Sequence, residues 1–388
     1  MVPVNSAEWT GEESPADEDR GPSREAKRRP RRLDGLTALR AIAAMAVIFF
    51  HANARMPEGF GLSRYLPFVD HYYLGVDLFF ILSGFILAHV HGAEFAKVTP
   101  RRAGNFYILR LARIYPVHVA MLACYLVLFF SFDLVGRQLG VAHRYTAETF
   151  LGQLFLVLPG AIAWNFPAWS VSAEWLAYLA FPLIAFSFWR LSARYCFVSL
   201  LVITVGFAAV YGWAFGGTMD HVGIVRVAFE FTAGYLLYRS AFAAPLATLL
   251  PVLAATLLVA ATLFGTRFGD FGAVLATGGL VVLAARARAG TVAALPRPLL
   301  WLGEISYSLY MVQSLPLAGF GRFVASLRAP APMSTALTAV VVLVLIDIVA
   351  AALLYRFVER PARNWLRDCL KRWARPTLAR FEAIGIRG

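Results

Sequence analysis

The sequence predicts an all-α fold, a polytopic membrane helix bundle, from three observations. Of the 388 residues, 59% are hydrophobic and only 15% are charged, whereas soluble globular domains carry roughly 25% charged residues. The mean hydropathy is +0.64. Apolar runs of about 20 residues recur along the chain, and this is the length that spans a bilayer core. These observations exclude a soluble enzyme, a disordered protein and a disulfide-stapled secreted domain.

We expect about ten transmembrane helices and one short re-entrant segment. The segment 150–163 is too short to span and is interrupted by Pro159 and Gly160, so we interpret it as the re-entrant, half-buried piece. No internal repeat is visible. The ten predicted spans are residues 36–54, 72–91, 114–132, 173–190, 195–213, 225–242, 245–264, 271–285, 299–318 and 335–355.

Two tails flank the membrane domain. Residues 1–32 combine an acidic and a basic stretch with few apolar side chains, a composition typical of disorder, so we predict a disordered cytoplasmic tail. Residues 33–370 form the membrane-embedded domain, and residues 371–388 form a cytoplasmic C-terminal tail. We expect no appended soluble domain after residue 355.

The net charge of +13 comes from 36 basic and 23 acidic residues. In a soluble protein this excess would suggest nucleic acid as a partner. Here the basic residues lie in the short segments between apolar runs, which is the positive-inside pattern. We therefore expect the lipid bilayer and no nucleic acid as partner, and a multi-pass plasma-membrane protein with both termini in the cytoplasm. The three cysteines lack metal-ligand spacing, and we predict neither a disulfide nor a metal site.

The first span contains two ionisable residues, Arg40 and His51. Eleven residues at 100° each bring both onto one helix face, separated by about 16 Å along the axis. Ionisable residues inside apolar spans are functional candidates because they are costly there. The alternative is structural: the histidine bonds to a neighbouring carbonyl and the arginine extends to the headgroups.

Further charges follow in the second predicted span and on the cytoplasmic side, just before the third. Asp77 lies in an apolar helix and needs a cationic or donor partner within the bundle. Arg110 and Arg113 are spaced i, i+3 on one helix face, and two adjacent guanidinium groups suit a multiply charged phosphate. The alternative for this arginine pair is a purely topogenic role.

The segment 167–175 opens the fourth predicted span. Ser170 or Ser172 can cap that helix, and Glu174 would lie in its first turn, where the helix dipole favours a carboxylate. The alternative for Glu174 is to be the partner of an active-site histidine or arginine. Tyr307 lies in a run that we interpret first as helix-end structure, and Asp347 has no evident partner in its apolar span.

Taken together, these segments resemble the acyltransferase 3 family, the integral-membrane O-acyltransferases that modify O-antigen, exopolysaccharide and other glycans. They occur in family order from residue 33 to about residue 370. The matching stretches are Leu33 to Arg40 with ten residues to His51, Gly75 to Phe80 running to Phe85, Arg110-x-x-Arg113, Trp169-Ser170-x-Ser172-x-Glu174, Ser306 to Tyr310, and Glu359-Arg360-Pro361.

The resemblance implies a catalytic role for His51 together with Arg40, and functional roles for Arg110, Arg113 and Glu174. Further candidates for the site are Asp77, Ser170, Ser172 and Tyr307. The chain departs from the family at Gln313, because many members have a histidine after the Ser-Tyr-Ser-Leu-Tyr run. Glutamine can hydrogen-bond but cannot titrate, so any proton-handling role at that place is absent.

We therefore predict transfer of a short acyl group, such as acetyl, from acyl-CoA to a hydroxyl of a glycan or exopolysaccharide. No cofactor is permanently bound; acyl-CoA is the donor substrate, with its phosphates against Arg110 and Arg113. His51, with a reference pKa near 6.5, takes the hydroxyl proton. Glu174 or Asp77 fixes the tautomer of His51, as the acid does in catalytic triads.

Two alternatives remain open at this stage. The same chemistry can act on a macrolide or another natural product, through a glycosylated or polyketide hydroxyl. From another functional class, the buried charges can serve a proton-coupled transporter. Transporters usually show internal repeats with paired broken helices, and none is visible in this sequence.

The predicted topology can be tested by cysteine labelling in intact cells. Residues 133–147 should be labelled from outside, and residues 286–297 should be protected, because only the second loop is rich in arginine. If Arg190 or Arg194 proved extracytoplasmic, the segment 150–163 would have to be a full span, and the count of ten would be wrong.

Overall fold

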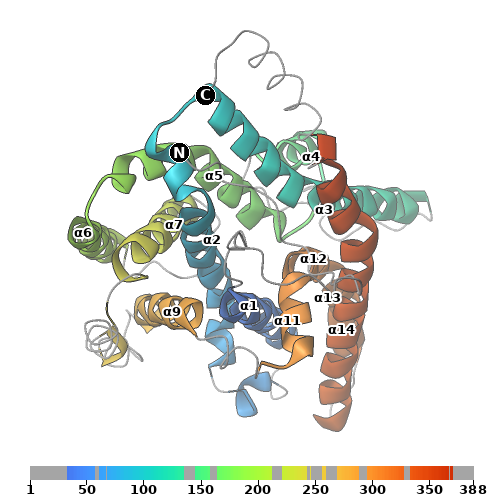
Figure 1. Cartoon of the computed structure of the whole chain (residues 1–388). Helices are drawn as coiled ribbons and strands as arrows, with labels where there is room; N and C mark the ends of the chain where they lie inside the picture. Colours follow the sequence, from blue (N-terminus) through green and yellow to red (C-terminus); the bar gives the residue numbers. More distant parts are fainter. Residues whose placement is uncertain are drawn as a thin grey trace, which may run out of the picture.

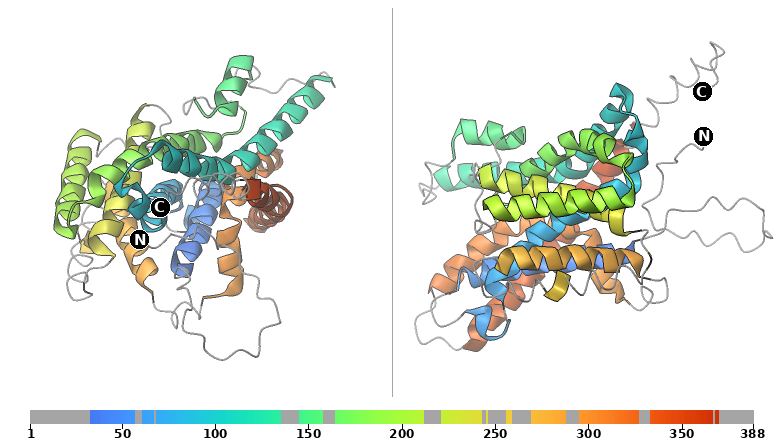
Figure 2. Two further views of the ribbon diagram at one scale, coloured as in Figure 1. Left: turned by 45° about the horizontal axis from the view of Figure 1, so that its top comes forward. Right: turned by 90° about the vertical axis from the view of Figure 1, so that its left-hand side faces the viewer.

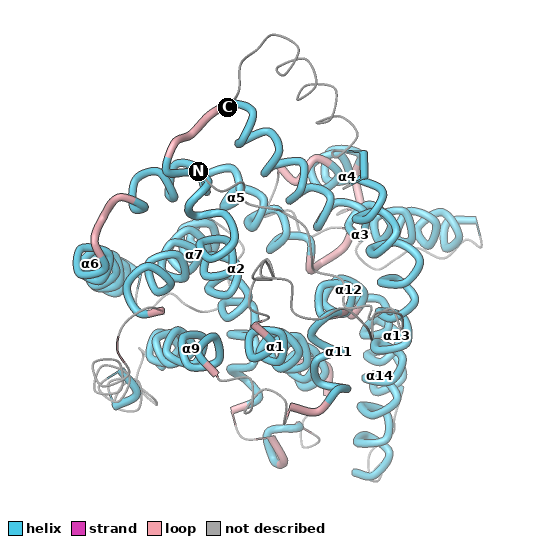
Figure 3. Tube along the Cα trace, viewed as in Figure 1, coloured by secondary structure: helices cyan, strands magenta, loops and turns pink. Residues whose placement is uncertain are grey.

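The structure, a computed structural model, describes residues 33–56, 61–66, 68–134, 145–157, 164–211, 221–242, 245, 256–258, 269–287, 295–326, 333–366 and 368–369. These residues form helices and loops only (Figure 3). The two predicted tails, residues 1–32 and 371–388, and most of the predicted span 245–264 lie outside the described residues.

The described helices follow one another along the whole membrane domain (Figure 1). The longer ones are α1 (Asp34–Asn53), α2 (Gly75–His91), α3 (Pro100–Leu134), α5 (Ala168–Trp189), α6 (Ala193–Tyr211), α7 (His221–Ala241), α9 (Gly269–Arg286) and α14 (Met333–Leu354). The shorter ones are η1 (Leu62–Arg64), η2 (Val69–Leu74), η3 (Gly92–Ala96), α4 (Ala147–Leu154), α11 (Arg297–Glu304), α12 (Ser306–Val312), α13 (Ser314–Ser326) and the π-helix η5 (Tyr355–Glu359).

Among the described residues, seven helical segments are long and apolar enough to cross a membrane: Asp34–Asn53, Val69–Ala96, Pro100–Ser131, Ala168–Trp189, Ala193–Val210, Gly269–Arg286 and Ser334–Leu366. Each overlaps one of the ten predicted spans, which confirms the polytopic helical fold. The predicted span 225–242 is also helical, as α7, and carries Arg226, Glu230 and Arg239. The predicted re-entrant piece includes the end of α4, whose eight residues are too few to span.

Two predicted spans differ in the structure. The helix predicted at 114–132 is α3, which starts at Pro100 and has 35 residues, a length of about 52 Å. The residues of α3 before position 114 are too polar for a hydropathy pattern to include them in a span. The helix nevertheless begins at Pro100, because proline is well suited to the first position of a helix. The span predicted at 299–318 is divided into α11, α12 and α13, with breaks at Ile305 and Gln313.

Helices α1 and α2 form the centre of the bundle. About 61% of the membrane-length window of each is buried, compared with 11% for α6 and 28% for α14. In Figure 1, α1 lies among α2, α9 and α11, with α6 and α14 at opposite sides of the molecule; Figure 2 (right) shows α6 and α9 running in nearly the same direction. The outward side chains of α6 and α14 are apolar, as expected of helices that face lipid.

Glycine allows α2 and α7 to touch backbone to backbone. A Cβ atom added at Gly84 of α2 would overlap the carbonyl of Phe231, and one added at Gly234 of α7 would overlap the carbonyl of Ile81. Small residues at such crossings are the usual means of close helix packing in membranes, where the hydrophobic effect does not drive association. The pair α2–α7 is therefore fixed in one register.

The same crossing contains the partner that Asp77 requires. Arg226 of α7 holds the fully buried Asp77 in a two-pronged ion pair, with its Nε donating to Oδ1 at 2.6 Å and its Nη2 donating to Oδ2. Glu230, one turn further along α7, accepts from the same Nε at 3.3 Å. Asp77 is thus a structural counter-ion between two helices.

Replacing Asp77 by alanine should leave the Arg226 charge buried with less compensation. Breaking a buried pair costs about 3–5 kcal/mol, which should appear as a lower midpoint of thermal unfolding of the detergent-solubilised protein. The control is Asp70→Ala, which removes an exposed carboxylate bonded to Asn53 and should change the midpoint little. Equal effects of the two substitutions would contradict a structural role for Asp77.

Candidate functional site

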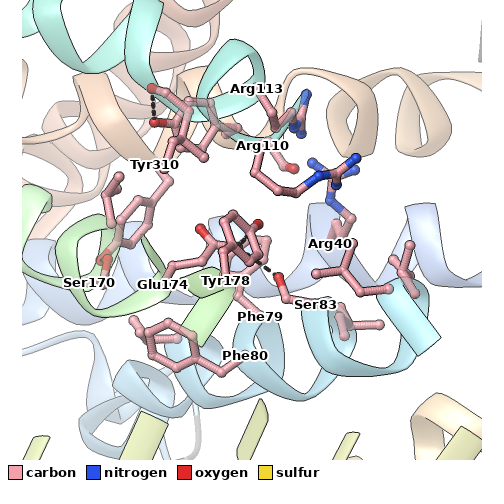
Figure 4. A pocket seen from close by; sticks show the side chains of 18 residues that line it. Arg40, Phe79, Phe80, Ser83, Arg110, Arg113, Ser170, Glu174, Tyr178 and Tyr310 are labelled. Atoms are coloured by element: carbon pink, nitrogen blue, oxygen red, sulfur yellow. Dashed lines mark hydrogen bonds between the residues drawn. The ribbon is translucent and has the colours of Figure 1, made fainter. Parts of the chain in front are cut away.

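A cavity of about 150 Å³ lies in the middle of the bundle and is enclosed by α1, α2, α3, α5 and α12 (Figure 4). Six of the nine candidate residues from the sequence line it, although they come from four helices far apart in the chain. They are Arg40, Arg110, Arg113, Ser170, Glu174 and Tyr307. The remaining lining residues include the apolar side chains Val76, Phe79, Phe80, Leu82, Ile86, Leu87, Ile114 and Val171 and the hydroxyl groups of Ser83, Tyr178, Ser306 and Tyr310.

The cavity has a cationic end and a hydroxyl end. In Figure 4 the guanidinium groups of Arg40, Arg110 and Arg113 gather on one side, Ser170 and Tyr310 lie on the other, and Glu174 lies between them. The two ends therefore suit different parts of one elongated ligand.

Arg113 is the neutralised member of the cationic end. It forms an ion pair with Glu359, a buried carboxylate that also accepts from Ser308 Oγ at 2.7 Å and lies 3.8 Å from Arg363. The Tyr307 ring lies 5.6 Å from the Arg113 guanidinium carbon. Glu359 belongs to the π-helix η5, a local widening often found at functional sites.

Arg40 and Arg110 have no carboxylate partner among the residues that the structure describes. Arg110 has one long contact, 3.5 Å from Nη2 to the Nε2 atom of His91, and its buried Nε has no hydrogen-bond partner there. Ser306 Oγ, in the same cavity wall, is likewise buried and unbonded. Since buried polar atoms are nearly always hydrogen-bonded, the cationic end fits an oxygen-rich, anionic ligand.

Glu174 is fixed by two hydroxyl groups. Its Oε1 accepts from Ser83 Oγ at 2.8 Å and from the Tyr178 hydroxyl. At the hydroxyl end, Ser170 Oγ donates to the Pro167 carbonyl at 3.0 Å and shares a hydrogen bond with the Tyr310 hydroxyl at 2.8 Å. These bonds join α2, α5 and α12 along the cavity.

The start of α5 corrects the capping predictions. The helix begins at Ala168, directly after Pro167, and has no side-chain cap. Ser170 and Ser172 therefore lie inside the helix, and Ser172 Oγ is buried without a partner in the described part of the chain. Glu174 is the seventh residue of α5 and lies beyond the first turn. Tertiary hydrogen bonds replace the local capping that the sequence pattern suggests.

His51 lies outside the cavity lining. Its ring is 5.1 Å from that of Phe50 and 5.4 Å from that of Phe166, between ring centres. Phe166 directly precedes Pro167, whose carbonyl accepts from Ser170 at the hydroxyl end of the cavity. His51 is thus connected to that end through Phe166, and neither of its ring nitrogens bonds to a side chain or carbonyl within the described ranges.

Residues 33–356 match the family described as acyltransferase domain, which covers more than half of the chain. The chain belongs to this family. Its segments are similar to Protein 2 in picA locus of Rhizobium radiobacter, with 34% identity over 37% of this chain and 78% of that protein. They are also similar to Acyltransferase MdmB of Streptomyces mycarofaciens, with 34% identity over 39% of each chain.

A third relative of this acyltransferase-domain protein is O-acetyltransferase OatA of Staphylococcus aureus, with 27% identity over 45% of this chain and 28% of that protein. The matched region thus covers well under half of the length of the second and third relatives. No solved structure matches.

The structure corrects one further expectation for this family member. Neither Glu174 nor Asp77 bonds to His51, because Glu174 is held by Ser83 and Tyr178, and Asp77 is held by Arg226 on the far side of α2. A carboxylate that orients His51 is thus absent from the described residues.

Sequence reasoning did not assign Tyr178, Ser83, Ser306 or Tyr310 to the site. A signal existed for Tyr178, which follows Glu174 by four residues and so shares its helix face. Ser306 and Tyr310 stand in the run Ser306 to Tyr310, but their approach to α3 and α5 depends on the break at Ile305, which no local pattern indicates.

The contrast between paired and unpaired cations predicts stability losses of different size for two substitutions. Glu359→Ala should cost about 3–5 kcal/mol in unfolding free energy, because it leaves Arg113 buried without its anion. Arg110→Ala removes an unpaired charge and should cost at most about 1 kcal/mol. Unfolding of both variants in detergent, without any donor, measures the difference. A loss at Arg110 as large as that at Glu359 would mean that Arg110 is a structural residue.

Proposed function

We propose that the protein is an integral-membrane O-acyltransferase that moves a short acyl group, such as acetyl, from acyl-CoA to a hydroxyl of a glycan or exopolysaccharide. One observation carries this proposal: among the described residues, the cavity runs from two guanidinium groups without an ion-pair partner to a hydroxyl end at Ser170 and Tyr310, and Phe166, four residues before Ser170, packs against the His51 ring. Membership of the acyltransferase-domain family supports it, and so does the similarity to O-acetyltransferase OatA.

The cationic end receives the phosphates of the donor. Arg40 and Arg110 supply charge-assisted hydrogen bonds to phosphate oxygens, and Arg113 contributes less because Glu359 neutralises it. The cavity, at about 150 Å³, is smaller than the roughly 300–1,000 Å³ of sites that enclose a whole ligand. The pantetheine arm therefore enters the cavity, and the nucleotide stays at the cytoplasmic surface.

The reaction itself takes place beside His51. The acceptor oxygen attacks the thioester carbonyl carbon while His51 takes the hydroxyl proton; the carbon–sulfur bond then breaks, and the CoA sulfur receives the proton. The products are the ester and the CoA thiol. With a reference pKa near 6.5, histidine is suited to this exchange at neutral pH. Glu174 holds the hydroxyl groups of Ser83 and Tyr178 in the cavity wall.

We place the protein in the plasma membrane with both termini in the cytoplasm, where acyl-CoA is available. In this proposal it needs neither a metal nor a permanently bound cofactor. A second acceptor class, a macrolide or other natural product, would accept the acyl group by the same chemistry. The neighbouring genes distinguish the two, because a polysaccharide locus and a polyketide cluster would name different acceptors.

Substitutions at His51 test the reaction. His51→Ala and His51→Gln should both lower acyl transfer from radiolabelled acyl-CoA by about 10²–10⁴-fold, because neither side chain accepts a proton at neutral pH. Both variants should retain CoA binding, since the phosphates lie about 16 Å away along α1. Arg110→Ala, in contrast, should weaken CoA binding by about 10–100-fold, because it removes a charge-assisted contact to phosphate.

The matched control is Arg194→Ala, which removes an exposed arginine remote from the cavity. Full transferase activity of His51→Gln would refute the base assignment alone. Purified wild type that neither binds nor consumes acyl-CoA would refute the proposed acyl-CoA-dependent transferase activity. Proton-gradient-dependent uptake that His51→Ala uncouples would instead establish the transporter alternative.

A further inference from the structure

Ser306 is a buried hydroxyl that the mechanism above does not use. It is the first residue of α12, is fully buried and lines the cavity. The two residues that follow have partners: the Tyr307 hydroxyl donates to the Ile114 carbonyl at 2.6 Å, and Ser308 Oγ donates to Glu359. Ser306 Oγ has none in the described part of the chain. Since an unsatisfied buried hydroxyl is destabilising, this position suits a ligand contact.

Ser306 lies at the cationic end of the cavity. It directly precedes Tyr307, whose ring lies 5.6 Å from the Arg113 guanidinium carbon, and both Ser306 and Arg40 line the cavity. Helix α11, which leads into α12, is in backbone contact with α1, because a Cβ atom at Gly303 would overlap the Thr37 carbonyl. Figure 4 shows the Arg110 guanidinium beside that of Arg40.

The chemistry of this group favours a phosphate over a pantetheine amide. One hydroxyl donor and two guanidinium groups without carboxylate partners converge there. A tetrahedral phosphate can accept from all three and neutralise the charge. A neutral amide would leave both guanidinium charges uncompensated, which is costly at a buried position.

The length of the pantetheine arm indicates which of the three phosphates of CoA lies at Arg40. Arg40 and His51 are separated by about 16 Å along α1. The pantetheine arm has about 13 bonds between its own phosphorus and the sulfur, and at about 1.2 Å per bond in an extended chain it also measures about 16 Å. The phosphate attached to pantetheine, held at Arg40, therefore brings the thioester to the level of His51. A nucleotide phosphate held at Arg40 would put a longer chain between Arg40 and the sulfur, and the extended arm would then carry the thioester past the level of His51.

We infer that Ser306, with Arg40 and Arg110, binds the phosphate group attached to the pantetheine arm. This inference rests on the proposed function, because it assumes that acyl-CoA is the donor. It adds a residue to the donor site, and it fixes which end of the donor lies at the wall made by α1 and α12.

The test compares the affinities of purified protein for CoA, 4′-phosphopantetheine and pantetheine, measured by titration calorimetry. Ser306→Ala should weaken the binding of CoA and 4′-phosphopantetheine by about tenfold, as expected for one hydrogen bond to a charged group. It should leave the affinity for pantetheine unchanged. Ser306→Cys, a nearly isosteric variant with a weak donor, should behave in the same way.

The control is Ser240→Ala, because Ser240 Oγ donates to the Leu236 carbonyl within α7 at 2.7 Å and lies outside the cavity lining. Unchanged unfolding of the Ser306 variants without ligand shows that the fold is intact. Equal weakening for all three ligands, weakening for CoA alone, or no weakening at all would each overturn the inference. Wild type that fails to bind CoA would overturn the proposed function, and the inference with it.

Discussion

A charge inside a helix bundle in a membrane is tolerated only when an anion, a cation or a ligand compensates it. The described residues follow this constraint at Arg226 and at Arg113, which meet Asp77 and Glu359, respectively. They leave it unfulfilled at Arg40 and Arg110, which come from α1 and α3 and meet at one end of the cavity. The first two arginines join helices, whereas the second two create a demand for an external anion. For these four arginines, the presence or absence of an ion-pair partner among the described residues separates a structural role from a candidate binding role.

Close backbone contact makes that division possible. Gly84 and Gly234 bring α2 against α7, and Gly303 brings α11 against α1. With these helices fixed in register, side chains on α1, α2 and α12 cannot move together to fill the cavity, since bilayer interiors offer no water to satisfy a rearranged backbone. The space between the cations and His51 is thus maintained by the scaffold around it.

Local sequence patterns predicted the helices and much of the cavity lining, because both depend on spacing along one helix. Apolar length predicted ten spans, seven of which overlap a membrane-length helical segment of the described chain, and the placement of Arg40, Arg110 and Glu174 indicated residues that do line one cavity. The partner of Arg113 was beyond such reasoning, because Glu359 lies 246 residues away in sequence and reaches it through a π-helix.

The predictions that were wrong have one common cause, which is that local patterns do not reveal tertiary contacts. The capping roles of Ser170 and Ser172 were wrong because α5 begins at Ala168 and its first turns bond to other helices. The predicted span 299–318 breaks at Ile305, next to the contact of Gly303 with α1. In each case a tertiary contact replaced the local preference that the pattern expressed.

Helix α3 is a single rod with contacts at both of its functional levels. Arg110 lines the cationic end, while Tyr125, fifteen residues and about 22 Å further along, shares a 2.6 Å hydrogen bond with Ser314, which in turn donates to Asn165 beside Phe166. Pro116 lies between these two contacts and removes one backbone hydrogen bond from the helix, the usual place for a bend. One continuous helix therefore connects the cationic end of the cavity to the hydrogen-bonded residues that precede Phe166.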